Sequence, residues 1–209
     1  MGEPVPYPLR AVPIPPACQS GTVPPVTQIA RVVVLGSEST GSTTLAQDLS
    51  ERLGVAWVPE FLRGYADDKA TEVGSIWDIA WTPADFDAVA DGQMALEAEA
   101  VATARRHGQD LVVCDNDVLA VAVWHLRYLG TDSPTLAARA EPPVLYVLTT
   151  PDGVPFVQDG LRDGEHVREP MTQWFREALA TQPAPWIEVV GDREARVDQV
   201  GAWLSAHDR

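Results

Sequence analysis

The clearest chemical signal in the sequence is the loop 36–43, GSESTGST, which contains two glycines. It follows the β-branched apolar run 31–35 and precedes the segment 44–53, whose leucines recur at helical spacing. A strand, a glycine loop and a helix in this order predict a phosphate-binding loop, because the glycines let the backbone wrap an anion that the amides and the helix N-terminus face. A plain connector between strand and helix is the alternative. The candidate phosphate-binding residues are Gly36, Glu38, Ser39, Thr40, Gly41, Ser42, Thr43 and Thr44.

The loop departs from the usual pattern at Ser42, where such loops carry a lysine. Thr43 follows in the place where a hydroxyl would meet Mg²⁺. The sequence contains one lysine, Lys69, so that 14 of its 15 basic residues are arginines. Any substitute for the missing charge is therefore expected to be an arginine.

Polar residues follow the predicted strands, at the edge of a parallel sheet where ligands collect. Glu60, after the second strand, could accept the proton of an attacking hydroxyl, while Arg63 binds a phosphate or orients the carboxylate; a surface ion pair is the alternative. Asp115, directly after the third strand, could hold Mg²⁺ or its water shell, or cap a helix. Asp117 could cap the same helix or contact a substrate hydroxyl.

The segment 156–168 is rich in glycine and charge and lies between the fourth strand and the next helix. These properties predict a lid, because phosphoryl transfer requires a segment that excludes water and brings positive charge to the reacting group. Arg162 and Arg168 are the candidates for that charge, and surface contacts are the alternative.

The elements that must position these residues alternate along the chain. Five strands are predicted, at 31–35, 55–58, 111–114, 144–148 and 186–190. Helices are predicted at 44–53, 82–107, 116–130, 169–180 and 192–206, and the one at 82 has a strong start signal in Thr82, Pro83 and Asp85. The alternation predicts an α/β fold, a parallel five-stranded sheet flanked by helices on both faces.

Composition limits the classes of partner. The chain has 209 residues, 45% of them hydrophobic, which is enough for one domain with its own core. A formal net charge of -15 argues against a nucleic-acid partner or an anionic membrane surface. No apolar run approaches the roughly 20 residues of a membrane span, and no leader-like start is seen, so a cytoplasmic protein is expected. Cys18 and Cys114 are too few for a disulfide framework or a zinc site.

Residues 1–30 differ from the rest, because they hold eight of the 18 prolines and little charge. They predict an extended arm outside a domain that spans 31–209. The arm is either disordered or lies along a neighbouring subunit, which would make the protein a homo-oligomer.

Four segments resemble the ribosylnicotinamide kinase domain of NadR-type proteins, within the P-loop nucleoside and nucleotide kinases. They are GSESTG at 36–41, WVPE at 57–60 with Arg63 and Tyr65, DND at 115–117 followed by Val123-Trp124, and VQDGLR at 157–162 with Arg168. The resemblance does not cover the arm.

The resemblance implies a P-loop kinase-like fold with a short arginine-bearing lid, and transfer of the γ-phosphate of ATP to the 5′-hydroxyl of nicotinamide riboside. It implies ATP and Mg²⁺ as cofactors and a small nucleoside as partner. It implies catalytic roles for Glu60, Asp115, Arg162 and Arg168, metal binding by Thr43 and Asp115, and substrate binding by Arg63, Tyr65, Asp117, Trp124 and Asp159. Trp57, Tyr65, Trp124 and Tyr128 could enclose a flat pyridinium or could be core residues.

Ser42 leaves three hypotheses open. In the first, Arg162, Arg168 or Arg63 supplies the charge and the chain phosphorylates nicotinamide riboside. In the second, the same fold phosphorylates a different acceptor. The third hypothesis is a non-catalytic nucleotide-binding sensor or scaffold, because loss of one preorganised donor commonly costs about 2.7–4 kcal/mol of transition-state stabilisation.

Overall fold

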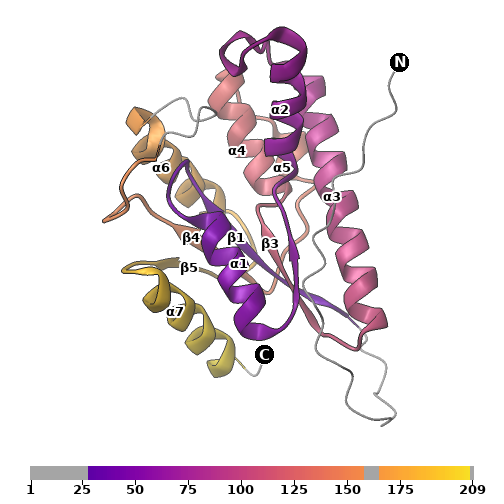
Figure 1. Ribbon diagram of the computed structural model, residues 1–209, viewed down its shortest axis with the longest axis vertical. Helices are drawn as coiled ribbons and strands as arrows, with labels where there is room; N and C mark the ends of the chain where they lie inside the picture. Colours follow the sequence, from indigo (N-terminus) through magenta and orange to yellow (C-terminus); the bar gives the residue numbers. More distant parts are fainter. Residues whose placement is uncertain (1–27, 158–164, 208–209) are drawn as a thin grey trace.

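A computed structural model describes residues 28–157 and 165–207 (Figure 1). Residues 1–27 of the predicted arm therefore lie outside the described residues. Asp159 and Arg162 lie outside them as well. The elements in chain order are β1 (Ala30–Gly36), α1 (Ser42–Leu53), β2 (Ala56–Val58), α2 (Phe61–Val73), η1 (Ile76–Asp78), α3 (Pro83–Arg106), β3 (Leu111–Asp115), α4 (Val118–Leu129), α5 (Pro134–Ala137), β4 (Leu145–Thr149), η2 (Glu165–Val167), α6 (Arg168–Ala180), β5 (Trp186–Val189) and α7 (Arg193–Ala206), where η1 and η2 are 3-10 helices.

The five strands form one parallel sheet in the order β2-β3-β1-β4-β5, which confirms the predicted fold class. Strand β1 lies in the middle, and its Val34 is level with Asp115 of β3 and Val147 of β4. The carboxyl ends of these strands therefore meet at one edge of the sheet. Because the chain runs from β1 to one side of the sheet and later returns to β4 on the other, a crevice opens at the end of β1.

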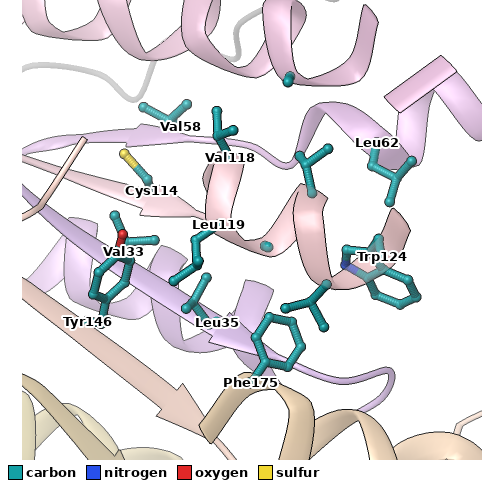
Figure 2. Packing of buried hydrophobic residues seen from close by; sticks show 14 of the residues in the cluster. Val33, Leu35, Val58, Leu62, Cys114, Val118, Leu119, Trp124, Tyr146 and Phe175 are labelled. Atoms are coloured by element: carbon teal, nitrogen blue, oxygen red, sulfur yellow. The ribbon is translucent and has the colours of Figure 1, made fainter. Parts of the chain in front are cut away.

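Helices cover both faces of the sheet (Figure 1). Successive side chains of β1 point to alternate faces, and both sets are apolar. Val32 and Val34 point to the face that α1 and α7 cover, where Leu49 and Val200 pack. The next residues along the strand point to the face that α3, α4 and α6 cover, as Figure 2 shows for Val33 and Leu35. All four strand side chains are fully buried, as expected for a strand of a two-sided parallel sheet.

The predicted strands and helices hold to within a few residues, whereas α2 and α5 were not predicted. Helix α3 begins with the predicted capping box, in which Asp85 accepts from the backbone N–H of Thr82 and Pro83 stands in the first turn. Strand β1 begins at Ala30 and Ile29 is already buried in the core, so the folded part starts slightly before the expected boundary at 31. In the part of the chain that the structure describes, no helix combines the length and apolarity required to cross a bilayer.

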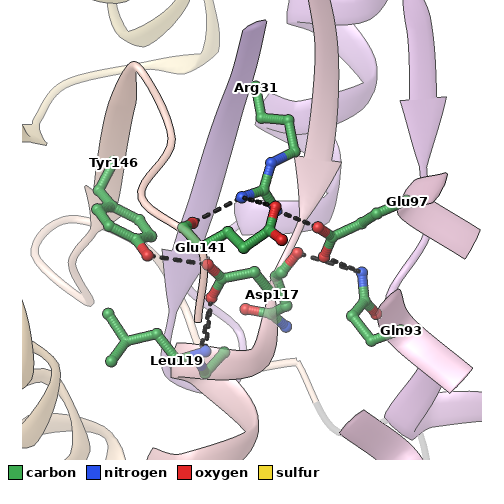
Figure 3. A network of polar contacts seen from close by, with 9 residues as sticks. Arg31, Gln93, Glu97, Asp117, Leu119, Glu141 and Tyr146 are labelled. Atoms are coloured by element: carbon green, nitrogen blue, oxygen red, sulfur yellow. Dashed lines mark hydrogen bonds and ion pairs between the residues drawn. The ribbon is translucent and has the colours of Figure 1, made fainter. Parts of the chain in front are cut away.

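A buried polar network joins the start of β1 to α3 (Figure 3). Arg31 forms an ion pair with Glu97 and donates from Nη2 to the carbonyl oxygen of Glu141 at 2.6 Å. Gln93 donates from Nε2 to Oε1 of Glu97 at 3.3 Å. Burial raises the pKa of Glu97 to about 7, although the charge of Arg31 acts in the opposite direction.

The free energy of unfolding is expected to depend on pH through Glu97. The folded protein holds this proton more tightly than the unfolded chain does, where the carboxyl titrates near its ordinary value of 4.5. The contribution of Glu97 to stability is therefore complete below about pH 4.5 and is lost as the pH rises through 7. At about 1.4 kcal/mol per pKa unit, the rise from 4.5 to about 7 makes the full component on the order of 3–4 kcal/mol.

Chemical denaturation at pH 5 and pH 8 measures this component, with the change between the two pH values as the readout. The Glu97→Gln variant is expected to lose it, whereas Glu99→Gln, an exposed change on the same helix, is expected to keep it. An unchanged pH dependence in Glu97→Gln would contradict the assignment.

Candidate active site

The phosphate-loop candidate connects β1 to α1 at the crevice. Its backbone adopts left-handed conformations at Ser39 (φ 57°) and Gly41 (φ 85°). Gly36 is required by space, because a Cβ there would collide with the hydroxyls of Thr40 and Thr149. These two hydroxyls lie 2.7 Å apart, and Thr40 also donates to the carbonyl oxygen of Ser37 at 2.7 Å. The loop is thus held in a curved shape from its buried side, where the Thr40 side chain lies.

A single pocket joins the loop to α2, η1 and α4. Its loop end is polar and is formed by Gly36, Ser37, Glu38, Ser39, Gly41, Ser42, Thr43 and Thr44. Its other end is largely apolar and is formed by Leu62, Ala66, Ile76, Trp81, Trp124 and Tyr128. Glu60, Arg63 and Asn116 lie along it as well. The pocket therefore brings together residues that are distant in sequence and that the sequence placed after three different strands.

Glu60 and Asn116 form a hydrogen-bonded pair in this pocket. Asn116 donates from Nδ2 to Oε1 of Glu60 at 2.7 Å, and Arg63 Nε lies 4.0 Å from the other carboxylate oxygen. Asn116 has a positive φ of 71°, which asparagine tolerates better than most residues. Sequence reasoning did not select Asn116, although an asparagine directly after a buried strand is a usable signal. The pair leaves Oε2 of Glu60 on the side of Arg63.

Asp115 lies beneath the pocket at the end of β3, with only 1% of its surface exposed. It accepts a hydrogen bond from the Thr43 side chain. Its Oδ1 has no hydrogen-bond partner among the described residues. Burial, with the neighbouring charge of Glu60, raises the pKa of Asp115 to about 7. An orphaned buried carboxylate oxygen beside a threonine hydroxyl is a suitable donor set for a hard cation.

The model of the AAA domain family matches residues 31–196, which include every part of this pocket. The chain belongs to that family.

Similar solved structures place this AAA domain among P-loop kinase folds. A NadR protein in complex with NR has a TM-score of 0.64 and 19% identity, over 86% of this chain and 53% of that one. Thymidylate kinase from Ehrlichia chaffeensis has a TM-score of 0.56 and 12% identity, over 85% of this chain and 99% of that one. Deoxyadenosine kinase from M. mycoides with bound dATP has a TM-score of 0.52 and 12% identity, over 84% and 99%. The AAA domain spans about half the length of the NadR chain, and no curated protein sequence matches it.

Gln93 couples the two turns of the AAA domain that carry Glu60 and Asn116. Its Oε1 accepts from the backbone N–H of Phe61 at 2.9 Å, and its Nε2 lies 3.3 Å from the carbonyl oxygen of Asn116. The side chain is 1% exposed. Sequence reasoning did not assign it a role, because a glutamine on a helix is usually a surface residue; its place on the buried stripe of α3 was the available signal.

Two residues proposed for substrate binding have hydrogen-bond partners within the protein. Asp117 is 1% exposed, caps α4 through the backbone N–H of Leu119 at 2.9 Å, and accepts from the hydroxyl of Tyr146 at 2.9 Å (Figure 3). This geometry favours the capping alternative, since both carboxylate oxygens are used. The Tyr65 hydroxyl donates to Asp85 at 2.8 Å, and its ring stacks on Trp81. Tyr65 thus supports the pocket wall from behind.

The aromatic candidates also separate by position. Trp124 and Tyr128 line the pocket, with ring centroids 5.9 Å apart, and Trp81 stacks on Tyr128 at 5.1 Å. Trp57 packs instead with the core on the opposite face of the sheet, which favours its core alternative. Trp81 was not selected from the sequence as a site residue. It lies ahead of α3, in a segment without a periodic hydrophobic pattern.

Arg168 contacts the phosphate-loop candidate from the side of the predicted lid. It begins α6, is 6% exposed, and donates from Nη2 to the carbonyl oxygens of Ser39 and Val154, both at 2.9 Å. The described start of the lid segment meets the loop as well, since the backbone N–H of Val157 donates to Ser39 Oγ at 3.0 Å. Among the described arginines proposed to replace the lysine, Arg63 lines the pocket, whereas Arg168 holds the loop backbone.

Proposed function

We propose that this AAA domain is a nucleoside kinase that transfers the γ-phosphate of ATP to the 5′-hydroxyl of nicotinamide riboside. The observation that carries the proposal is the pocket, because a phosphate-loop candidate, a hydrogen-bonded carboxylate and three aromatic side chains line it together. A nucleoside has a flat base that suits aromatic side chains and a sugar hydroxyl that suits a carboxylate and a phosphate-binding loop.

Glu60 is proposed as the general base. Its Oε1 is held by Asn116, so that Oε2 can accept the proton of the 5′-hydroxyl. As that proton leaves, the hydroxyl oxygen forms a bond to the γ-phosphorus, and the bond from that phosphorus to the β,γ-bridging oxygen breaks. ADP leaves with the bridging electron pair. The residues of the loop hold the triphosphate, and Arg63 beside Glu60 can orient the acceptor or the transferred group.

Mg²⁺ is proposed to be held by Asp115 and the hydroxyl of Thr43. The orphaned Oδ1 of Asp115 supports this assignment, because a buried carboxylate oxygen without a partner is costly unless a cation or water satisfies it. The described residues contain no cluster of three or more metal-ligating side chains, so the phosphates and water would supply the remaining ligands. When bound, Mg²⁺ neutralises charge that develops on the transferring phosphate.

Nicotinamide riboside is proposed as acceptor on the chemistry of the aromatic end. Trp81, Trp124 and Tyr128 present ring faces and edges in a pocket of a protein with a net charge of -15. Aromatic faces attract a flat cation such as a pyridinium, whereas a neutral base gains less from them. The similarity to a NadR structure that holds NR supports the same acceptor, and cytoplasmic NAD salvage is the expected setting.

Phosphate transfer from Mg-ATP to a nucleoside panel tests the proposal, with ATP binding measured separately by calorimetry. Turnover is expected on nicotinamide riboside, at a higher kcat/KM than on any neutral nucleoside. Preference for a neutral nucleoside would keep the kinase and change its acceptor. ATP binding without turnover on any acceptor would instead favour a sensor or scaffold, the alternative that Ser42 in the pocket wall supports.

A further inference from the structure

Two buried arginines donate to successive carbonyls of the phosphate-loop candidate. Arg168 Nη2 donates to the carbonyl oxygen of Ser39 at 2.9 Å, and Arg196 Nη1 donates to that of Thr40 at 2.7 Å. The two side chains come from α6 and α7 and are 6% and 5% exposed. Arg196 also donates from Nε to the carbonyl oxygen of Gly191 at 2.9 Å, which ties the loop to the turn after β5.

Arg196 is a buried cation whose charge is not balanced within the folded part of the chain. Across residues 28–157 and 165–207, no carboxylate forms an ion pair with it, and burial alone lowers its pKa. Its Nη2 is buried and has no hydrogen-bond partner among those residues. A guanidinium stays charged in proteins, and burying one without an anion is strongly unfavourable. The arrangement therefore leaves an uncompensated positive charge on the buried side of the loop.

The contacts of Arg196 identify the peptide group on which this charge acts. A Cβ built on Gly41 would be 3.6 Å from Arg196 Nη1, so the guanidinium lies directly against the peptide group that joins Thr40 to Gly41. Gly41 lines the pocket, whereas Arg196 contacts the same peptide from its carbonyl end. Because the carbonyl and the N–H of a peptide are opposite ends of one dipole, a cation on the carbonyl makes the N–H a stronger donor to an anion.

We propose that Arg196, together with Arg168, supplies from behind the loop the positive charge that is missing at Ser42. Arg196 is a positioning residue, since it acts on the phosphates of a bound nucleotide through the loop backbone. The inference rests on the proposed function only in requiring that the loop bind a polyphosphate. It explains how a neutral serine stands in the pocket wall while the loop keeps a cationic environment.

Calorimetric binding of inorganic triphosphate and of a non-hydrolysable ATP analogue tests the proposal at fixed salt. Arg196→Gln is expected to weaken both affinities at least about tenfold, the size of losing a charge-assisted hydrogen bond. The matched control is Arg193→Gln at the start of α7, the helix that also carries Arg196. It removes one positive charge from an exposed ion pair with Asp48 of α1. The control is expected to bind within about twofold of the wild type. Equal affinities for the wild type and Arg196→Gln would overturn the proposal.

Rescue by a lysine at position 42 separates an electrostatic role from a structural one. Ser42→Lys is expected to restore triphosphate binding when added to Arg196→Gln, and to give the wild type at most a small gain. A tenfold gain in the wild type would mean that the loop lacked the charge, and would overturn the proposal even if Arg196→Gln does not fold. Failure of the lysine to rescue a folded Arg196→Gln would do the same.

The same titrations distinguish the two proposals. A wild-type protein that binds triphosphate with the expected Arg196 dependence, yet phosphorylates no nucleoside, would contradict the kinase alone. A wild-type protein that binds neither triphosphate nor the ATP analogue would contradict both.

Discussion

The Glu60→Gln variant is expected to lose about a hundredfold to ten-thousandfold in kcat, the range that general-base catalysis contributes, while it keeps its affinity for ATP. Glutamine has the shape of glutamate, and its carbonyl oxygen can still accept from Asn116 Nδ2, which lies 2.7 Å from the present carboxylate. The change therefore removes the proton acceptor and leaves the local geometry in place. Steady-state kinetics on the accepted nucleoside, with calorimetric ATP binding, measures both quantities.

The matched control is Glu72→Gln, which removes an exposed carboxylate from the same helix region and is expected to leave kcat unchanged. A kcat for Glu60→Gln within about threefold of the wild type would exclude Glu60 as the base. An equal loss of ATP affinity in Glu60→Gln would instead mean that the side chain organises the pocket.

The Asp115→Asn variant is expected to lose the Mg²⁺ dependence of nucleotide binding and at least about a hundredfold in kcat/KM. The carboxylate is the buried acidic group beside Thr43, and an amide oxygen is a much weaker ligand for Mg²⁺. Calorimetry of the ATP analogue with and without Mg²⁺ separates the metal effect from binding of the triphosphate alone. Affinity without the metal is expected to stay near that of the wild type.

Asp110→Asn is the control, because it makes the same change at an exposed position ahead of the same strand. Loss of folding is not expected for Asp115→Asn, since burial already disfavours the charged form and raises the pKa of Asp115 to about 7. A variant that still shows the full enhancement by Mg²⁺ would contradict the assignment of this residue to the metal.

The local elements of the fold could be predicted because short patterns determine them. The β-branched run of β1 is buried on both faces in the structure, as the absence of polar alternation in it indicates. The start of α3 follows from a capping box, an interaction between residues only three apart. The two glycines of the loop likewise indicate a phosphate-binding loop, and in the structure Gly36 has no room for a side chain.

Candidate site residues were predictable where position along the chain was sufficient. Glu60 follows β2 and Thr43 opens α1, and the parallel order of the strands brings both to the same pocket. Asp117 shows the limit of this reasoning, because the same position directly before a helix suits a ligand contact and a cap equally. The hydroxyl of Tyr146, 29 residues away in sequence, favours the cap.

By itself, the sequence determined the order of the five strands and of five of the helices, the type of loop and the absence of a lysine from it, because each depends on neighbouring residues. Helices α2 and α5 were not predicted. Only the tertiary structure decided which polar side chains meet. Gln93 contacts Asn116 across 23 residues and Arg196 contacts Thr40 across 156, and neither residue differs in type from those on an exposed helix. The physical reason is that burial and hydrogen-bond partners depend on how the helices pack on the sheet. The type of a single residue does not determine either of them.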